Sequence, residues 1–235
     1  MTEPAVSLAF FDPEREVHGT LRSGVAALFE GDRARTLEAV PEIARDGESW
    51  TASCGDDLEL RFEPCTPALD LGGTTAWVCR VSGRAAGGEV ACLGTAGETT
   101  VPPAWAELDA LRTVAAVFDE ENAVLAVARR PRGALGHGQE LVTAHLVSGG
   151  EAVTVEKARL STVYDGEGRQ RTAGLELWLP GEDFPRRASG AVRAGLSLTL
   201  ETLRVNLAIF AWRMEGRDGL GAYEITGRED PAEAA

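Results

Sequence analysis

Apolar and polar residues alternate along most of the chain in short runs, a pattern that predicts β-strands. In Leu58–Glu63 and again in Leu175–Leu179, apolar side chains occupy every second position. This period of two is typical of a strand with one buried face and one solvated face. Runs of this kind are separated by Gly, Asp, Asn and Pro at intervals of about 8–12 residues, and no long helix is predicted. The pattern indicates an all-β protein of antiparallel neighbouring strands.

Similar segments occur in the same order in both halves. Leu21–Ala34 (LRSGVAALFEGDRA) resembles Leu111–Ala123 (LRTVAAVFDEENA), with Val25 aligned to Val114, and Ala76–Arg84 resembles Ala211–Arg217, which aligns Trp77 with Trp212. Such self-similarity indicates a tandem duplication. We therefore predict two antiparallel β-barrel or barrel-like sandwich domains.

Between the repeated parts, residues 95–109 contain Gly97, Pro102 and Pro103 and begin without periodicity, so the boundary is predicted there, giving domains 1–100 and 101–235. The second half also carries an insertion, mostly within Arg129–Gly168.

The charge and composition limit the partners that the chain can have. Its formal net charge of -14 repels phosphate backbones, so no nucleic acid partner is expected. Neither a secretory signal nor an apolar run of about 20 residues is present, which predicts a soluble, cytoplasmic protein without membrane insertion. Exposed edge strands could pair two copies into a homodimer.

Metal and cofactor motifs are absent from the sequence. The four cysteines, at positions 54, 65, 79 and 92, are widely spaced and form no CxxC pair, so we expect buried free thiols rather than a zinc site. The chain has no GxGxxG unit, phosphate-binding loop, HExxH or GxSxG elbow. No metal and no cofactor are therefore predicted.

Three residues are candidates for acid–base chemistry. Tyr223 and Glu224 follow a glycine-rich turn, and strand alternation places them on opposite faces. His145 lies within an alternating run and titrates near neutral pH. Each has a structural alternative: Tyr223 could pack in the core, Glu224 could pair with a nearby arginine, and His145 could be a solvent-facing strand residue.

Four aromatic residues are candidates for lining an apolar pocket, namely Tyr164, Trp178, Phe210 and Trp212. Small closed barrels of about eight strands can hold one ligand inside. Aromatic residues on strands also form ordinary core, and Trp212 has a counterpart in the first half, which favours an architectural role. The four residues therefore predict either a ligand pocket or a filled interior.

Three short segments carry a resemblance to a known family: Phe11-Asp12-Pro13 with Gly19 soon after, the stretch from Trp105 to Phe118-Asp119, and the ending Gly216–Arg228. In these the chain resembles the two-domain lipocalin-like proteins related to carotenoid 1,2-hydratase (hydroxyneurosporene synthase). The resemblance implies two lipocalin-like β-barrels and an isoprenoid or lipid-like ligand.

One departure from the family pattern lies at the junction of the halves. Members of the family commonly bear Arg, Asp, His and Trp-Gly there, whereas Cys92–Thr100 contains no Asp, His or Trp. The hydration or cyclisation activity of the family therefore does not carry over to this chain through that motif.

Three functions follow from these observations. The leading hypothesis is lipocalin-like binding of an apolar small molecule inside a β-barrel. A second is a hydratase, cyclase or isomerase that acts on such a ligand, with Glu224, Tyr223 or His145 as the proton donor. A third is a structural or partner-binding protein whose barrels are filled by side chains. The sequence leaves open whether the protein is an enzyme.

Overall fold

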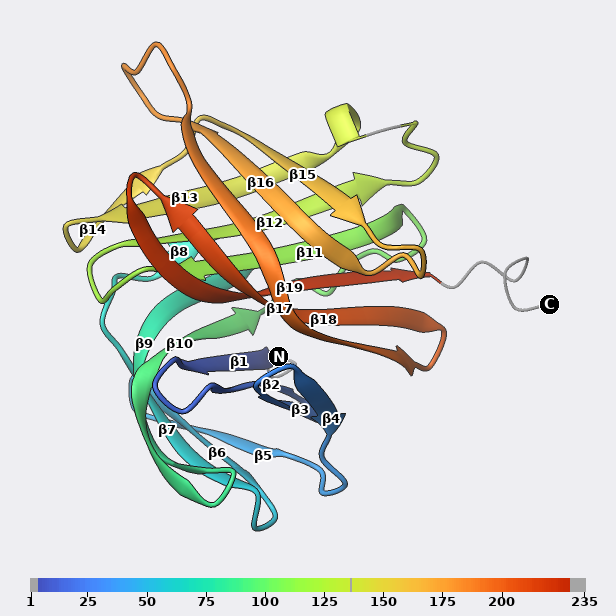
Figure 1. Ribbon diagram of the computed structural model, residues 1–235. Helices are drawn as coiled ribbons and strands as arrows, with labels where there is room; N and C mark the ends of the chain where they lie inside the picture. The colour runs from blue at the N-terminus through green and yellow to red at the C-terminus, as the bar shows by residue number, and fades with distance from the viewer. Residues whose placement is uncertain (1–3, 136, 229–235) are drawn as a thin grey trace.

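Two curled antiparallel sheets make up the protein, as the computed structural model in Figure 1 shows. The structure describes residues 4–135 and 137–228. Within them the only helical element is a single 3-10 turn, η1 (His137–Gln139). One sheet is built from the first part of the chain and the other from the second. The predicted all-β fold is confirmed.

The first sheet has the strand order β4-β3-β2-β1-β10-β9-β7-β6-β5, and the short β8 pairs with β9. Its strands are β1 (Ala5–Asp12), β2 (Val17–Arg22), β3 (Val25–Glu30), β4 (Arg33–Thr36), β5 (Glu42–Asp46), β6 (Ser49–Cys54), β7 (Leu58–Pro64), β8 (Leu69–Asp70), β9 (Thr74–Ala85) and β10 (Gly88–Thr99).

The second sheet has the strand order β14-β13-β12-β11-β19-β18-β17-β16-β15. Its strands are β11 (Leu108–Val117), β12 (Ala123–Pro131), β13 (Leu141–Ser148), β14 (Glu151–Thr154), β15 (Lys157–Tyr164), β16 (Gln170–Trp178), β17 (Arg186–Leu200), β18 (Leu203–Met214) and β19 (Arg217–Arg228). Strand by strand the order repeats that of the first sheet, with β11 in the place of β1 and β19 in the place of β10. The chain is a tandem duplication.

The strand order corrects the sequence alignment of the two halves. That alignment paired Val25 with Val114, which sets β3 against β11, whereas the sheet order makes β11 the counterpart of β1. Several hairpins in this chain share the pattern of a short apolar strand followed by a polar turn. A match between two such hairpins therefore does not fix which strands correspond.

Two Phe-Asp pairs mark the true correspondence. Phe11-Asp12 lies at the end of β1, and Phe118-Asp119 directly follows β11. The Oδ1 atom of Asp12 accepts hydrogen bonds from two backbone N–H groups of the next turn, each at 3.2 Å. Asp119 caps its own turn in the same way, through the backbone N–H of Glu121 at 2.9 Å. Carboxylates that cap turns in this way favour a chain reversal after each first strand.

Trp77 and Trp212 lie on corresponding strands, β9 and β18, but at different positions along them. Trp212 pairs with Gly219 next to the β18–β19 turn, whereas Trp77 pairs with Ala96, far from the β9–β10 turn. The predicted positional equivalence of the two tryptophans is therefore wrong. Both side chains nevertheless pack on the inner face of their own sheet.

Three hydrophobic cores hold the molecule together. The inner face of the first curl is filled by side chains such as Phe10, Leu28 and Trp50, and that of the second by side chains such as Phe210 and Leu177. A third core joins the two sheets to each other; it includes Phe11, Phe29, Val78, Leu125 and Ile209. Strands that contribute to two cores are buried on both faces, which explains their nearly continuous apolar runs.

The four cysteines are free thiols, as predicted. Cys54 and Cys79 are buried, and Cys65 and Cys92 are half-buried. Burial raises the pKa of Cys79 and that of Cys92 to about 12, so both stay protonated at neutral pH. Within the described residues no helix has the length and apolar character needed to cross a membrane.

Candidate functional site

A cleft of about 1000 Å³ lies between the two sheets. The β1–β2 hairpin and β10 form one wall, and the end of β11, the middle of β17 and the β18–β19 hairpin form the other. Phe11 supplies aromatic lining and Leu93 and Leu220 supply aliphatic lining, whereas Phe118 and Trp212 border the cleft but pack on the inner core of the second curl. Concave, mainly apolar spaces of this size with a few polar groups are typical of small-molecule sites.

Besides Asp12, which caps the β1–β2 turn, His18 is a buried titratable group of this cleft. It lies on β2, on the face turned toward the second sheet, and is only 5% exposed. Its Nδ1 atom has no hydrogen-bond partner among the described residues. Burial lowers its pKa from the ordinary 6.5, against the opposing effects of Asp12 and Glu16, while Arg193 lowers it further. A neutral imidazole in a cleft can exchange a proton with a bound molecule.

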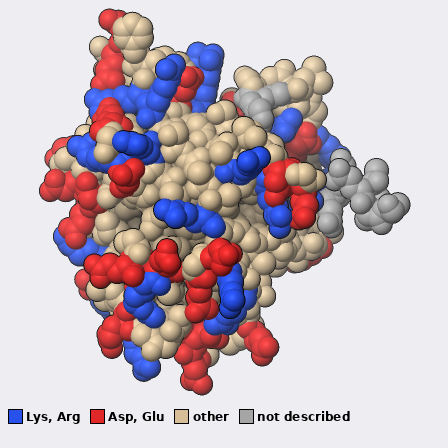
Figure 2. All heavy atoms as spheres, viewed as in Figure 1, with Lys and Arg blue, Asp and Glu red and all other residues tan. Residues whose placement is uncertain are grey.

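The two walls of the cleft differ in charge. Acidic residues lie on the first-sheet wall: Asp12, Glu14, Glu16 and Asp32. The second-sheet wall carries Arg193 and Arg213, of which Arg213 lies 3.9 Å from Asp218. Figure 2 shows acidic groups prominent over the first-sheet half of the face in view. The first-sheet wall is therefore acidic, whereas the second-sheet wall carries two arginines and Asp218.

Polar contacts fasten the two sheets around the third core. Arg80 and Glu120 form two hydrogen bonds, at 2.8 and 2.5 Å. Arg22 pairs with Glu224 beside a smaller space of about 110 Å³ between the sheets. Further contacts link His145 Nε2 to the Asp70 carbonyl and the Arg129 guanidinium to the Leu71 carbonyl. These contacts link the two sheets outside the cleft.

Tyr223, a predicted acid, lies inside the second curl rather than in the cleft. It is fully buried, and its hydroxyl contacts Thr162 Oγ1 at 2.5 Å and accepts from Arg112 Nη1 at 3.1 Å. Burial raises the pKa of Tyr223, and the Arg112 guanidinium opposes this increase. The hydroxyl is thus a neutral member of an internal hydrogen-bond network.

The same network contains a buried ion pair between Arg112 and Glu140. The two side chains are 2% and 1% exposed. Glu140 belongs to the connection between β12 and β13, which includes η1, whereas β2 and β3 are joined only by Ser23-Gly24. Part of the extra length of the second half therefore carries a carboxylate into the interior.

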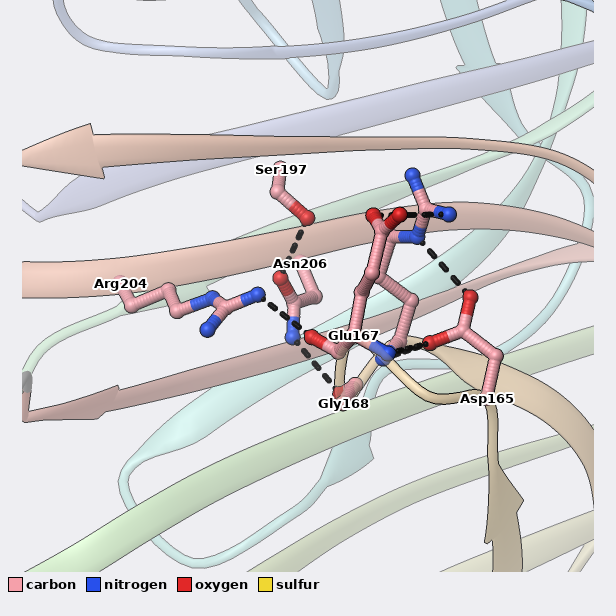
Figure 3. A network of polar contacts seen from close by, with 7 residues as sticks. Asp165, Glu167, Gly168, Ser197, Arg204 and Asn206 are labelled. Carbon is pink, nitrogen blue, oxygen red and sulfur yellow. Dashed lines mark hydrogen bonds and ion pairs between the residues drawn. The ribbon is translucent and has the colours of Figure 1, made fainter. Parts of the chain in front are cut away.

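A second group of polar contacts holds the β15–β16 turn (Figure 3). Asp165 caps the turn by accepting the backbone N–H of Glu167 at 2.9 Å. Arg204 Nη2 donates to the Glu167 carbonyl at 2.8 Å, and Asn206 Nδ2 donates to the Gly168 carbonyl at 3.3 Å. The side chain of Asn206 also accepts from Ser197 Oγ at 2.7 Å. These bonds join the β15–β16 turn to the β17–β18 hairpin, which gives them a structural role.

The other two predicted acid–base residues serve the interface between the sheets. Glu224 pairs with Arg22, and its Oε1 atom accepts from Thr226 Oγ1 at 2.7 Å. His145 Nε2 lies 2.8 Å from the Asp70 carbonyl of the first sheet. The structure therefore does not bring Tyr223, Glu224 and His145 together in one site.

The four predicted lining residues also separate. Phe210 is core and packs on Trp212, with ring centroids 5.5 Å apart. Trp178 lies outside the inner core, beside the cations of Lys157 and Arg159, and Tyr164 is 37% exposed. Only Trp212 of the four borders the cleft.

Another hollow, of about 1020 Å³, lies over β5, β6, β7 and β9 of the first sheet. Its lining includes the charged residues Glu42, Glu59, Arg61, Arg84 and Glu89. Its described lining residues include no aromatic side chain, so it suits an apolar ligand less well than the cleft does. No cluster of three or more His, Cys, Asp or Glu side chains suitable for a metal ion occurs in the part of the chain that the structure describes.

Sequence reasoning missed His18 and Arg193. His18 is one of only three histidines, and it lies in a strand that follows Phe11-Asp12-Pro13, a segment already noted for the family resemblance. That combination could have identified it. Arg193 gave no comparable signal, because its place in the cleft depends on an irregularity of β17 that alternation alone does not reveal.

Comparisons with known proteins agree on the fold. The chain is similar to kievitone hydratase from Nectria haematococca, with a TM-score of 0.59 and 10% identity over 99% of this chain and 90% of that one. It is similar to a protein assigned as ATTH from Nitrosomonas europaea, with a TM-score of 0.60 and 12% identity over 97% and 93%. It is also similar to CghA, with a TM-score of 0.59 and 10% identity over 96% and 88%.

No family model matches the sequence, and no curated protein matches it. At these identities the likeness concerns the fold alone. The predicted two-domain lipocalin-like fold is confirmed at that level.

Proposed function

We propose that this protein binds a mainly apolar small molecule, of isoprenoid or lipid type, in the cleft between its two sheets. The observation that carries the proposal is the cleft itself, which Phe11, Leu93 and Leu220 line together with the buried imidazole of His18. Burial of apolar ligand surface against such walls provides affinity, while the few polar groups fix orientation.

The proposal places the ligand outside the barrels, unlike the sequence-based hypothesis. The inner faces of both curls are packed with side chains, including Trp50 and Phe62 in the first and Phe210 in the second. Interiors packed to this degree leave little room for a ligand. The space between the sheets is lined by apolar groups and open to entry, so it is the better candidate.

A second candidate function is acid–base chemistry on the bound molecule. One of the structural neighbours is a hydratase by name, and the unpartnered Nδ1 of His18 is a group that could move a proton in this cleft. Addition of water to a double bond, removal of water or double-bond migration all need such a proton transfer. His18 replaces Glu224, Tyr223 and His145 as the proposed donor, because those three are engaged in interface or internal contacts.

Binding can be tested with N-phenyl-1-naphthylamine, a neutral probe that fluoresces in apolar surroundings. Ala91 lies on β10, is exposed and lines the cleft, so Ala91→Trp should fill the cleft without disturbing the core. We expect saturable binding by the wild-type protein and a loss of about tenfold or more in Ala91→Trp. The matched control, Ala152→Trp on β14, should bind within about twofold of wild type.

Two results would overturn the binding proposal: no saturable binding by the wild-type protein, or equal affinity in Ala91→Trp and Ala152→Trp. Catalysis has its own test, incubation of a source lipid extract with the protein in D2O. Wild type should place solvent deuterium on carbon in a product that mass spectrometry detects, and His18→Asn should not. Equal labelling by both proteins would exclude His18 as the proton donor.

A further inference from the structure

Strand β17 carries an irregularity at the edge of the cleft. In its pairing with β18, Val192 lies opposite Phe210 and Ala194 lies opposite Ile209, so Arg193 is an extra residue. This is a β-bulge, in which two residues of one strand face one residue of the other. Bulges occur where a strand bends or where a side chain is redirected next to a functional site.

The bulge moves the following residues to the other face of the sheet. Ala188 and Val192 pack on the inner core of the second curl, whereas Ala194 and Leu196 pack in the core between the sheets. All four positions are even, so a regular strand would keep them on one face. The inserted residue allows β17 to contribute to both cores, and the residue inserted is an arginine that lines the cleft.

The duplication provides an internal comparison for this feature. The counterpart of β17 in the first sheet is β7, which pairs with β9 in continuous register from Leu58 opposite Ala85 to Pro64 opposite Cys79. The first sheet therefore has no bulge at this place. The arginine and its irregular strand are specific to the second sheet, whose residues form one wall of the cleft.

Within the described residues, no acceptor lies within hydrogen-bonding distance of the Arg193 side chain, which is exposed in the cleft. A guanidinium group only donates hydrogen bonds, so its partner must present an acceptor oxygen. The opposite wall carries Asp12, Glu14, Glu16 and Asp32, whose charge disfavours an anionic partner. A neutral molecule with a carbonyl oxygen satisfies both conditions.

We propose that Arg193 anchors the ligand of the cleft, and that this ligand is a neutral, apolar molecule bearing a carbonyl oxygen near His18. The inference rests on the proposed function, since it specifies the ligand class of the same cleft. The guanidinium donates a charge-assisted hydrogen bond to the carbonyl, and Phe11, Leu93 and Leu220 cover the apolar body. A carbonyl held in this way is polarised next to a group able to exchange a proton.

A set of three probes tests the ligand class. Prodan is a neutral naphthalene with a carbonyl group, N-phenyl-1-naphthylamine is neutral without one, and 8-anilinonaphthalene-1-sulfonate is the same aryl amine bearing a sulfonate. We expect Arg193→Gln to weaken Prodan binding by about tenfold or more, the loss of one charge-assisted hydrogen bond, and to leave N-phenyl-1-naphthylamine within about twofold. Bound Prodan should also emit at shorter wavelength in Arg193→Gln, because its carbonyl has lost a charged donor.

Two variants separate the local contact from the overall charge. Arg171→Gln removes one positive charge from an exposed site on β16 outside the cleft and should leave all three affinities unchanged. Arg193→Lys keeps a cationic donor and should retain more of the Prodan affinity than Arg193→Gln does. Circular dichroism spectra that match wild type confirm that each variant is folded.

The outcomes distinguish this inference from the proposed function. If the wild-type protein binds none of the probes, the cleft is not a ligand site and the proposed function fails. If N-phenyl-1-naphthylamine binds but Arg193→Gln changes Prodan binding no more than Arg171→Gln does, only the role of Arg193 is overturned. If the sulfonate probe binds more tightly than its neutral analogue and depends on Arg193, the ligand is an anion and the neutral class is wrong.

Discussion

Removal of the Glu140 side chain should destabilise the protein severely, because it leaves the Arg112 guanidinium charged and buried. The two side chains are 2% and 1% exposed, so solvent cannot replace the lost carboxylate. Breaking a buried pair from one side costs about 3–5 kcal/mol of unfolding free energy. Arg112 keeps neutral acceptors in Thr162 and Tyr223, but these do not balance its charge. We expect a loss within that range for Glu140→Ala.

Equilibrium unfolding in urea, followed by tryptophan fluorescence, measures this loss. The control is Glu120→Ala, which breaks the exposed pair with Arg80, whose side chains are 46% and 59% exposed. An exposed pair contributes about 0–1 kcal/mol. The double variant Arg112→Met/Glu140→Leu removes both charges and should be more stable than Glu140→Ala, because buried pairs can be replaced by apolar groups at little cost. A loss in Glu140→Ala no larger than that in Glu120→Ala would refute the reasoning.

Three further predictions follow from burial. Proton NMR should give His18 a pKa below 6.5. The unfolded imidazole then takes up a proton at a higher pH than the folded one, so the folded state should lose stability as the pH falls below about 6.5. A measured pKa at or above 6.5 would contradict the burial argument. Cys79 and Cys92, with pKa values of about 12, should react with a disulfide reagent at pH 8 far more slowly in the native protein than in guanidinium chloride, and equal rates would show that they are exposed. Gly221→Ala should lower the unfolding free energy by about 1–3 kcal/mol or more, because the added Cβ would lie 1.7 Å from a carbonyl oxygen of β11. Gly166→Ala is the control and should change the unfolding free energy little, because a Cβ there has open space around it. Equal effects of the two variants in thermal melts would refute the contact.

The fold class followed from alternation and turn residues because each depends only on neighbours in the sequence. Leu58–Glu63 is the strand β7 with alternating buried and exposed positions, as predicted. Duplication was also visible, but the strands that correspond were not. Val25 and Val114 occupy similar local patterns, and only the pairing of β11 with β19 shows that β11 corresponds to β1.

The site was harder to predict, because it lies between parts of the chain that are far apart in sequence. Phe11 and His18 meet Phe118 and Trp212 only after each half has folded and the two sheets have packed together. Trp212 was predicted as a lining residue from its aromatic character, which does not say which cavity it borders. Arg193 depends on a single inserted residue in β17, and no local sequence pattern specifies such a bulge.

For Tyr223 and Glu224 the sequence suggested a reactive role, whereas the structure shows both side chains engaged in contacts within the protein. Their position after a glycine-rich turn suggested a reactive pair at a barrel mouth, whereas Glu224 joins the sheets through Arg22 and Tyr223 closes an internal network with Arg112. Partners more than 100 residues away decide both roles. Sequence alone therefore identified chemically capable residues without showing which of them are free to act.

Photo-crosslinking tests most directly whether the ligand lies between the sheets. A neutral aliphatic ketone bearing a diazirine would be bound, irradiated and located by peptide mass spectrometry. Our account predicts labels in the segments around Phe11–His18 and Ala211–Arg213, which line the cleft, and a loss of both in Ala91→Trp. Labels confined to inner-face segments such as Leu160 and Leu175, unchanged in Ala91→Trp, would place the ligand inside the second curl and contradict the account.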